Sequence, residues 1–597
     1  MTTDQNYQQI YRVGGMLDAG FVGQITYTIS LDQVYDELDI HFSFDKRLYS
    51  ESDVTPELID RLQTLCTAKY DAPTYPVEEF RQTILHEMKT EIHTMAELND
   101  NFIGCIHRQL TDRHMLYTKE FTSDGCLAQD TFSGVLKVTV LVFNVLLDNT
   151  QYTLTVSGHP VGQGVIAPNF NLMDTVKTAA GNAGASNAAG SADNSCEAES
   201  APASAVATAG SSGVSGAGSA AMAGDSSTTG SSSAGNTVTA STRFKRLELH
   251  NHTVESDGSL TCQELTEYLA ADHVDAFAIT DHNTTSGQKK IEQLLEEKHY
   301  PISLIRGMEY TTYFGHILCL NLAKYVPWNS IDQHRPELLF EAAREKGALV
   351  GIAHPFSYGD PFARGCRFEM TISDYSKVDF IEIFNNPEPL HEVNERGTNL
   401  WMSLIFSGYQ ITATSGMDLH NRAKLAGCYA TYIEGKNGGN IASELDTAIH
   451  THRTWVSKGA LLLTEVLPET NELLLTFTDA HKTGFAVSET AQVVLKGKDQ
   501  TLTMTVSLDK PVHVSLNQLS GTDPIIPLLY EAPGTNSAAV VSNATHVAAS
   551  TSCGNAADTS SAAATAALNA AAGQLEEIDT LPAIEGLLCV SPVLYRD

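Results

Sequence analysis

The chain has 597 residues, of which 37 are lysine or arginine and 71 are aspartate or glutamate, so that its formal net charge is −34. A surface this acidic argues against a role in holding long stretches of nucleic acid, because backbone binding requires basic patches. It does not exclude an enzyme that cuts phosphate esters, because metal ions can supply the positive charge. The length corresponds to about four domain-sized units of roughly 150 residues each.

Neither a targeting signal nor a membrane span is expected. The N-terminal residues lack the basic segment followed by an apolar segment that marks a secretory signal. No apolar run reaches the length of about 18 residues that a transmembrane helix needs. The 10 cysteines are scattered, and none forms a C-x-x-C pair, which is typical of reduced thiols. These features predict a cytoplasmic protein that does not bind membranes.

Residues 1–173 are expected to form a β-domain with a helical insertion. Apolar and polar residues alternate over 25–31, as in a half-buried strand. Further strand patterns occur at 38–44, 136–147 and 152–158. Between about 55 and 115 the spacing becomes helical, and Thr55 followed by Pro56 predicts a helix start. The domain offers no recognisable catalytic constellation.

Two segments stand apart by composition. Residues 174–241 and 534–574 consist mostly of Ala, Gly, Ser, Thr and Asn and carry no periodic apolar face. Such segments cannot offset the entropy of ordering a chain. We interpret the first as a disordered linker and the second as a disordered insertion. The insertion interrupts a small C-terminal β-domain, 458–597, whose strand patterns lie at 471–479, 491–497 and 501–508.

Between these domains, residues 242–457 alternate strand and helix patterns. The expected strands are 246–252, 276–282, 304–310, 316–322, 349–355, 380–386 and 411–418. Amphipathic helix patterns lie at 261–273, 288–299, 336–347 and 395–408. Seven short strands with helical crossovers predict an α/β fold, either a closed or nearly closed β/α barrel or an open doubly wound sheet. No G-x-G-x-x-G follows the first strand, which argues against a dinucleotide site.

Nearly every one of these strands ends in a potential metal ligand. Side chains at i and i+2 of a strand point to the same face, so that His250 can pair with His252 and Asp418 with His420. In a β/α barrel the carboxyl ends of the strands share one rim, where active sites form. Imidazole and carboxylate ligands suit divalent ions of zinc, manganese or iron. The full set of candidate ligands is His250, His252, Asp257, His282, Glu309, His316, His354, Asp418 and His420.

Taken singly, each of these residues has an ordinary structural explanation. Asp257 before Gly258 can form a turn, Asp281-His282 can cap a helix, and His354 before a proline can be a hydrogen-bonded core histidine. The position of the candidates at the ends of successive strands favours a metal site. Two adjacent ions acidify a shared water and bind the entering and leaving oxygens of a displacement, so the expected chemistry is hydrolysis.

The motifs LHNHTVESDGSLT, AITDHNTTSG, GMEYTT followed by GHILCL, IAHP and GMDLHN together resemble the PHP family, the polymerase and histidinol phosphatase metallohydrolases. The resemblance covers roughly 210 residues, and the β-domains on either side resemble the arrangement in CehA/McbA-type members. It implies a distorted (β/α)7 barrel with a trinuclear metal site.

Carried over by position, the resemblance gives each ion its ligands. His250, His252, Glu309 and Asp418 would hold one ion, Glu309, His316 and His354 a second, and Asp257, His282 and His420 a third. At the sixth strand this chain departs from the family, because it offers Asn385 and Asn386 where some members place a ligand. Asp281 is expected to orient an imidazole.

The leading functional prediction is a phosphoesterase that uses a metal-bridged hydroxide on a phosphate mono- or diester. The expected substrate is a small-molecule phosphate ester or a short nucleotide, and no oligomeric state is predicted. His282 or His354 would protonate the leaving group. The candidate substrate contacts are Asn385 and Arg422, with Arg364 and Arg367 as further arginines near the rim.

Two other functions are considered. The first is a carboxylic ester, carbamate or amide hydrolase with the same ions, which an apolar lining would favour. Its candidate lining residues are Phe314, Phe356, Tyr358 and Phe362. The second is a non-catalytic scaffold, which the retention of all nine ligand positions disfavours.

Overall fold

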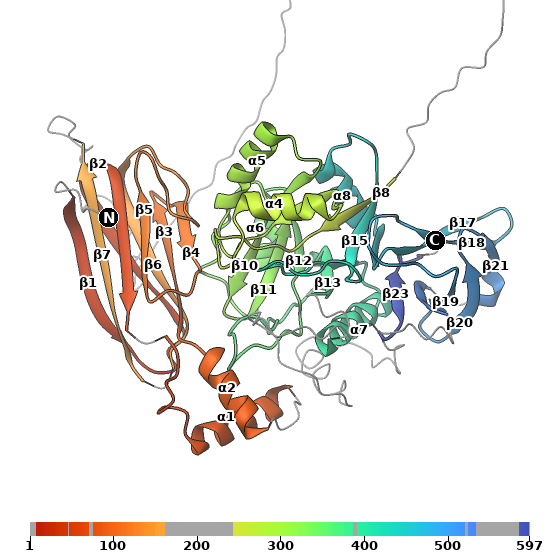
Figure 1. The fold of residues 1–597 in the computed structure, drawn as a ribbon, viewed down its shortest axis with the longest axis horizontal. Coiled ribbons are helices and arrows are strands. Elements are labelled where there is room, and N and C mark those ends of the chain that lie inside the picture. The colour runs from red at the N-terminus through yellow and green to blue at the C-terminus, as the bar shows by residue number, and fades with distance from the viewer. Residues whose placement is uncertain are drawn as a thin grey trace, which may run out of the picture. The chain divides into compact units, whose positions relative to one another are not determined.

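The computed structural model describes residues 7–45, 47–70, 76–146, 148–161, 243–385, 391–519, 523–532 and 584–595. The segments interpreted above as a linker, 174–241, and as an insertion, 534–574, lie outside these residues. Within the described ranges the chain forms a mixed α/β fold of three sheets, whose strand pairs are mostly antiparallel, with comparatively few helices (Figure 1).

The N-terminal part forms a seven-stranded sheet in the order β1-β7-β2-β6-β3-β4, with β5 paired to β2. The long β2 pairs with β6 over its first half and with β5 and β7 over its second half. The strands are β1 (Gln8–Leu17), β2 (Gly23–Phe44), β3 (Glu91–Leu98), β4 (Asn101–Ile106), β5 (Asp112–Tyr117), β6 (Phe132–Asn144) and β7 (Thr150–Pro160).

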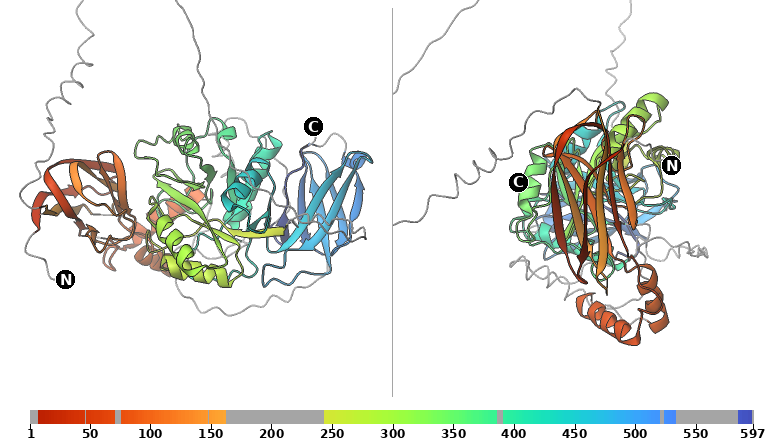
Figure 2. Two further views of the ribbon diagram at one scale, coloured as in Figure 1. Left: turned by 90° about the horizontal axis from the view of Figure 1, so that it is seen from above. Right: turned by 90° about the vertical axis from the view of Figure 1, so that its left-hand side faces the viewer.

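Two helices, α1 (Pro56–Tyr70) and α2 (Val77–His86), lie between β2 and β3 and extend beyond one end of the strands (Figure 2). They cover only part of the segment 55–115 that was expected to be helical, since β3, β4 and the start of β5 occupy its second half. The expectation failed there because seven of the eight residues of β3 are buried. A strand buried on both faces shows no clean alternation, so its period is ambiguous in sequence.

The two faces of β3 serve different cores. Ile92 and Ala96 belong to the apolar core of the N-terminal sheet itself. Met95, which points the other way, belongs to the large core formed with residues of the strands that follow the linker. The N-terminal sheet and those strands are accordingly parts of one compact unit, to which the described residues on both sides of the gap between 161 and 243 belong.

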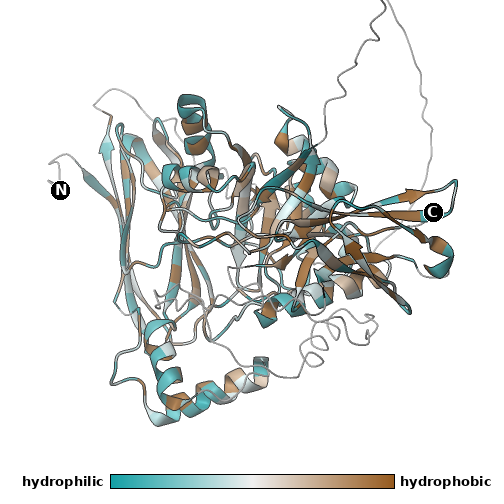
Figure 3. Cartoon of the chain, turned by 45° about the vertical axis from the view of Figure 1, so that its right-hand side comes forward, coloured by the Kyte–Doolittle hydropathy of each residue, from teal (hydrophilic) through white to brown (hydrophobic). Residues whose placement is uncertain are grey.

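The second sheet has thirteen strands in the order β14-β13-β12-β11-β10-β9-β8-β15-β16-β23-β22-β19-β20. Hydrophobic residues run along its central strands (Figure 3). The first seven strands are β8 (Arg243–Glu248), β9 (Ala276–Ile279), β10 (Ser303–Thr312), β11 (Gly315–Leu320), β12 (Leu349–Ile352), β13 (Phe380–Phe384) and β14 (Thr412–Ser415). The others are β15 (Ala430–Gly435), β16 (Thr454–Ser457), β19 (Thr490–Lys496), β20 (Thr501–Ser507), β22 (Ile526–Glu531) and β23 (Leu587–Val590).

A three-stranded sheet, β17-β18-β21, and five further α-helices complete the described fold. Helix α4 begins with a reciprocal capping box between Thr261 and Glu264, which fixes where the chain turns after the first strand. The strands are β17 (Ala460–Leu467), β18 (Glu472–Asp479) and β21 (Val512–Ser515). The helices are α4 (Cys262–Ala271), α5 (Ser286–Lys298), α6 (Glu337–Arg344), α7 (Glu392–Phe406) and α8 (Ile441–His450), with 3-10 turns at η1 (Tyr375–Lys377) and η2 (Leu516–Leu519).

All seven strands predicted for the middle segment are present as β8–β14, and α4–α7 match its predicted helices. The strand ladders of the described residues do not show the (β/α)7 barrel that the resemblance implied. Strand β11 is antiparallel to both β10 and β12, because only Tyr313 and Phe314 join β10 to β11, and two residues suffice for a hairpin but not for a parallel crossover. Beyond β8 the sheet continues through antiparallel pairs into the C-terminal strands.

The segment after β14 returns to the end of β8. Asn251 and Leu419 form a parallel bridge, in which His252 N donates to Leu419 O (3.0 Å) and Leu419 N donates to His250 O (3.1 Å). This bridge sets the residues around Leu419 beside the residues that follow β8, although they are about 170 positions apart in the chain.

Eight of the cysteines lie in the described ranges, and all of these are free. In the same ranges, no helix combines the length and the apolar composition needed to cross a membrane.

Candidate metal centre

His250 and His252, which follow β8, share the same two carboxylate partners. His250 Nε2 lies 3.1 Å from Glu309 Oε2 and 3.4 Å from Asp418 Oδ1. His252 Nε2 lies 3.3 Å from that glutamate oxygen and 3.0 Å from that aspartate oxygen. All four side chains offer ligand atoms within 4.8 Å of one another, so they can hold one ion.

Glu309, in β10, divides its two oxygens between two sets of imidazoles. Oε1 lies 2.7 Å from His316 Nδ1 and 3.0 Å from His354 Nε2. Oε2 lies 2.9 Å from His282 Nδ1 and also faces His250. The completely buried carboxylate is therefore placed to bridge two ions.

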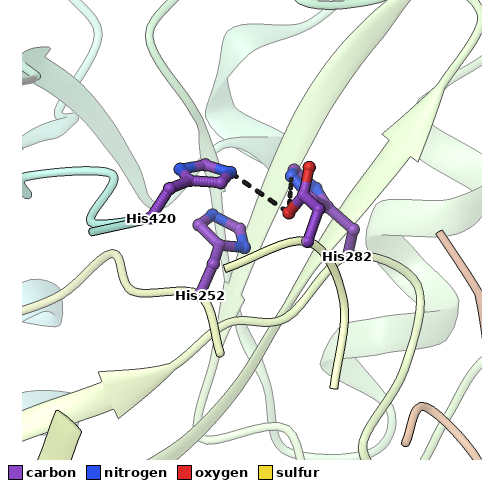
Figure 4. A group of neighbouring side chains, drawn as sticks. His252, His282 and His420 are labelled. Atoms are coloured by element: carbon purple, nitrogen blue, oxygen red, sulfur yellow. Dashed lines mark ion pairs between the residues drawn. The ribbon is translucent and has the colours of Figure 1, made fainter. Parts of the chain in front are cut away.

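A third group surrounds Asp257. Its Oδ1 lies 3.2 Å from His420 Nε2 and 3.6 Å from His282 Nε2. Figure 4 shows the rings of His252, His282 and His420 directed at a common space, with the last two ion-paired to a carboxylate. Stacked rings at 4.2 Å join His252 to each of the other two histidines.

The structure thus brings all nine of the residues predicted as ligands into one cluster. The grouping around His250 and Asp418 is the same as in the sequence-based assignment. Of the other two groups, the one around Glu309 and His316 contains His282 where His354 was predicted, and the one around Asp257, His282 and His420 gains His252. The cluster is therefore more continuous than three separate sites.

Many ligand atoms of this cluster are buried without a hydrogen-bond partner. Leaving such an atom unsatisfied costs about 1–3 kcal/mol each, so their concentration at one place needs a compensating charge. Divalent cations that accept imidazole nitrogen and carboxylate oxygen fit this donor set. The atoms are His250 Nε2, His252 Nδ1 and Nε2, Asp257 Oδ1, Glu309 Oε2, His316 Nε2, His354 Nδ1 and Asp418 Oδ1.

The electrostatics of the cluster keep its carboxylates ionised. Burial raises the pKa of Glu309, but His250, His316 and His282 outweigh this effect and hold the pKa well below its usual value. The pKa of Asp257 and that of Asp418 are depressed in the same way, against the effect of burial, by neighbouring histidines. Burial alone would lower the pKa of His420, but Asp257 and Asp418 raise it to about 10.

These shifts predict that metal affinity increases with pH. In the metal-free protein His420 retains its proton up to about pH 10, and the pKa of His250 is also raised, so an incoming ion must displace protons. Titration of the apo-protein with Zn²⁺ in two buffers of different ionisation enthalpy should show proton release at pH 7 and tighter binding at pH 8 than at pH 6. An affinity that does not change over this range would contradict the charge assignment.

Two ligands adopt left-handed backbone conformations that residues with a Cβ seldom occupy. His354 has a φ of 23° and Asp418 a φ of 48°. Both are held by neighbours, since His354 N donates to Glu382 Oε2 (3.0 Å) and Leu419 N donates to His250 O (3.1 Å). Backbone strain of this kind persists where the surroundings fix it and is common at functional sites.

Glu382, in the middle of β13, was missed by the sequence analysis. Its Oε1 lies 3.1 Å from His250 Nδ1, so the imidazole carries its proton on Nδ1 and directs Nε2 at the cluster. Asn385 Nδ2 donates to Glu382 Oε2 (3.0 Å) and thus holds this carboxylate in place. The available signal was a single acidic residue within the apolar strand FIEIF.

We expect Glu382→Gln to weaken metal binding by about 10- to 100-fold, which is the usual effect of removing a carboxylate that orients a ligand histidine. The amide can no longer enforce the Nδ1–H tautomer of His250. Metal titration of the purified variant measures the effect, with the exposed Glu434→Gln as the matched control. Equal affinity of Glu382→Gln and the control would show that the contact has no role.

We expected Asp281 to orient an imidazole, but its hydrogen bonds go to Thr253 and Ser256. Its Oδ1 accepts hydrogen bonds from Thr253 N and Ser256 Oγ, both at 2.7 Å, and its Oδ2 accepts one from Thr253 Oγ1 at 2.9 Å. The carboxylate therefore fixes the turn that carries Asp257. The expectation failed because adjacent positions at a strand end point to opposite sides.

The arginines considered as phosphate contacts are engaged elsewhere. Arg422 is exposed and lies over the Tyr268 ring at 5.7 Å. Arg364 pairs with Asp360, and Arg367 lies over aromatic rings. Asn386 lies outside the described residues. The aromatic side chains considered as an apolar lining pack into cores: Phe314 and Phe356 against the large core, and Tyr358 and Phe362 against α1 and α2.

The cluster is exposed on one side only. The side chains of Asp257, Asp418 and His420 are 22–24% exposed, whereas that of Glu309 is 0% exposed. Solvent therefore reaches the cluster at Asp257, Asp418 and His420.

The N-terminal sheet, whose sequence shows no recognisable catalytic constellation, also contributes to this region. His107 Nε2 lies 3.4 Å from Asp257 Oδ2, and the His107 ring stacks on His282 at 4.1 Å. Two further groups of potential ligands occur in this sheet among the described residues: buried Glu91, His93 and His107, and the more exposed His41, Asp112 and His114.

Comparisons with known proteins give partial matches. Residues 7–160 match a family described as a family of unknown function (DUF6669). An uncharacterized protein of Methanocaldococcus jannaschii, MJ1587, is 30% identical over 112 residues, which are 19% of this chain and 58% of that protein. A 5'-3' exoribonuclease of Haemophilus influenzae is 36% identical over 141 residues, which are 22% of this chain and 50% of that protein. The chain thus spans little more than half the length of these relatives.

Among solved structures, one similar chain comes from Bacteroides vulgatus. It is described as a two-domain protein containing a predicted PHP-like metal-dependent phosphoesterase. The likeness covers 48% of this chain and 90% of that chain, at 16% identity and a TM-score of 0.29.

Proposed function

We propose that this chain is a metal-dependent hydrolase of the PHP type that cleaves phosphate mono- or diesters. The observation that carries the proposal is the convergence of six histidines and three carboxylates, with unsatisfied ligand atoms, on one buried cluster. Two to three ions of zinc, manganese or iron match the donor set.

When bound, these ions would supply the positive charge that stabilises a phosphoryl transition state and promotes ionisation of the attacking water. Glu309 would hold two of them, because its two oxygens face different imidazoles. Glu382 and Asn385 keep His250 in its ligand tautomer, and Asp281 fixes the turn that carries Asp257. The protein's own groups thus preorganise the centre before substrate arrives.

The leaving group also needs a proton donor, for which the sequence offered His282 and His354. Both nitrogens of His282 face carboxylates, since Nδ1 lies 2.9 Å from Glu309 and Nε2 lies 3.6 Å from Asp257. His354 directs only Nε2 at Glu309 and keeps Nδ1 without a partner. We therefore favour His354 as the donor.

A small ester or a short nucleotide fits the charge and exposure of the site. With a net charge of −34, the chain is poorly suited to bind a long polyanion. The relative from Haemophilus influenzae is named an exoribonuclease, which acts at a chain end and is compatible with a phosphodiester substrate. Asn385 and Arg422 remain the proposed substrate contacts, and each would have to exchange its present partner, Glu382 or the Tyr268 ring, for the substrate.

A carboxylic ester, carbamate or amide hydrolase is the second candidate. It requires no positive side chain at the ions, and Arg364 and Arg367 contact Asp360 and aromatic rings instead. The aromatic side chains that would have favoured it pack into the cores. The same metal centre can act on a carbonyl carbon.

Turnover assays of protein loaded with Mn²⁺ or Zn²⁺ separate the two candidates. The substrates are p-nitrophenyl phosphate, bis-p-nitrophenyl phosphate, a short 5′-phosphorylated oligoribonucleotide and a naphthyl ester. We expect hydrolysis of at least one phosphate ester, which disappears with a chelator and returns with metal. Turnover of the naphthyl ester without phosphate hydrolysis would reject the phosphoesterase assignment in favour of the second candidate.

A further inference from the structure

Four polar residues lie in β3 and just beyond β4, where these strands pack against the metal-centre strands. Glu91 and His93 lie in β3, whereas His107 and Gln109 follow Ile106, the last residue of β4 and the last that pairs with β3. Met95 and Cys105, which lie opposite each other in the ladder, belong to the large core. The four polar residues are at most 8% exposed, so they replace apolar packing at this place.

These four residues contact one another directly. Gln109 Nε2 donates to Glu91 Oε1 (3.3 Å) and lies 2.8 Å from His93 Nε2. The His93 ring lies 3.9 Å from the His107 ring. Burying polar groups costs free energy unless they are hydrogen-bonded. Because His93 Nδ1, His107 Nδ1 and Gln109 Oε1 are buried without a partner, these residues stabilise the fold less than apolar side chains would.

One of these four residues, His107, contacts two of the metal-centre residues. Its Nε2 lies 3.4 Å from Asp257 Oδ2, while the other oxygen of Asp257 faces His420 and His282. The His107 ring stacks on His282 at 4.1 Å with an interplanar angle of 27°. One side chain of the N-terminal sheet thus fixes the orientation of a carboxylate and of an imidazole.

Loops between the strands of the same sheet also contact the residues on either side of Asp257. Arg108 Nη2 donates to Gly258 O (3.2 Å), and Gly125 N donates to Glu255 Oε2 (3.0 Å). Thr284, which follows His282, donates through Oγ1 to Gly125 O (2.9 Å). These contacts lie on both sides of Asp257 and beside His282.

We propose that His107 is a positioning residue for the ion site formed by Asp257, His282 and His420, and that the N-terminal sheet, which matches a family of unknown function, completes the metal centre. The inference rests on the proposed function, since it requires that the cluster binds metal. Its consequence is that one ion depends on a segment more than a hundred residues away from the metal-binding motifs in the chain.

The decisive comparison is between His107→Phe and His107→Gln in the full chain. Phenylalanine keeps the ring and the stacking on His282 but removes the donor to Asp257, whereas glutamine keeps a donor and loses the ring. We expect His107→Phe to weaken the binding of one ion by about 10- to 100-fold and to lower kcat more than it changes KM. His107→Gln should recover part of both. Exposed His86→Ala, at the end of α2, is the control, because His86 belongs to none of the groups of potential ligands.

Metal content by mass spectrometry, Mn²⁺ titration and the melting temperature of the metal-free protein are the readouts. A purely structural role would lower the melting temperature and leave the metal affinity of the folded variant unchanged, and this result would overturn the inference. Equal metal binding by wild type and His107→Phe would overturn it while leaving the proposed function intact. A wild-type protein that binds no metal would overturn both.

Discussion

Replacement of Glu309 by glutamine is expected to abolish hydrolysis and to remove at least one bound ion per chain. The glutamate is completely buried, and its two oxygens face His316 and His354 on one side and His250 and His282 on the other. A neutral amide offers a single oxygen and no charge, so it cannot bridge two ions. Losing several kcal/mol of transition-state stabilisation lowers kcat/KM by at least about a thousand-fold.

The measurement combines steady-state kinetics with metal analysis and circular dichroism of the same preparation. The exposed Glu434→Gln variant should retain full activity and metal content. If Glu309→Gln folds and keeps both its ions and its turnover, the assignment of a bridging carboxylate is wrong.

Gly416→Ala is expected to lower activity by about a hundred-fold or more without removing a single functional group. A Cβ at this position would lie 2.5 Å from His250 Cβ and 2.7 Å from Glu382 Oε1, closer than such atoms approach. The alanine must therefore displace His250 or separate the segment after β14 from the end of β8. Misplacement of a catalytic group by about 1 Å costs roughly this factor.

Gly484→Ala is the matched control, since its Cβ would lie 3.3 Å from Ala426 Cβ and far from any ligand. The comparison of kcat and of metal affinity between the two variants measures the effect. Unchanged kinetics in Gly416→Ala would mean that the close approach of this segment to His250 is not needed for the chemistry.

The elements that carry the site could be predicted because their signals are local. Strands such as β9 (AFAI) and β12 (LVGI) are short apolar runs, and most of the predicted ligands stand within a few residues of a strand end. The pairing of His250 with His252 followed from the two-residue period of a strand. Their common partners Glu309 and Asp418 are distant in sequence, and only the resemblance to a family grouped them.

The residues that were missed act through long-range contacts. Glu382 meets His250 across 132 positions, and nothing in its strand distinguishes it from a paired core carboxylate. His107, which follows β4, reaches Asp257 only because β3 and β4 pack on the metal-centre strands. The register of two strands is readable from sequence, but the surface on which a sheet packs is not.

The prediction of the sheet topology was wrong for a related reason. Strand and helix patterns predict the order of elements, but the direction of β11 depends on the two-residue connection after β10. Asp281 shows the same limit on a smaller scale, since its side chain turns to Thr253 and Ser256 instead of an imidazole.

An anomalous-scattering map, from crystals of the full chain grown with Mn²⁺ or Zn²⁺, tests the central claim most directly. The account predicts two or three peaks within the cluster, at about 2.0–2.3 Å from imidazole nitrogens and carboxylate oxygens. One peak should lie between His250, His252 and Asp418, and Glu309 should contact two peaks. A map without peaks among these residues, in crystals that contain the metal, would contradict the account.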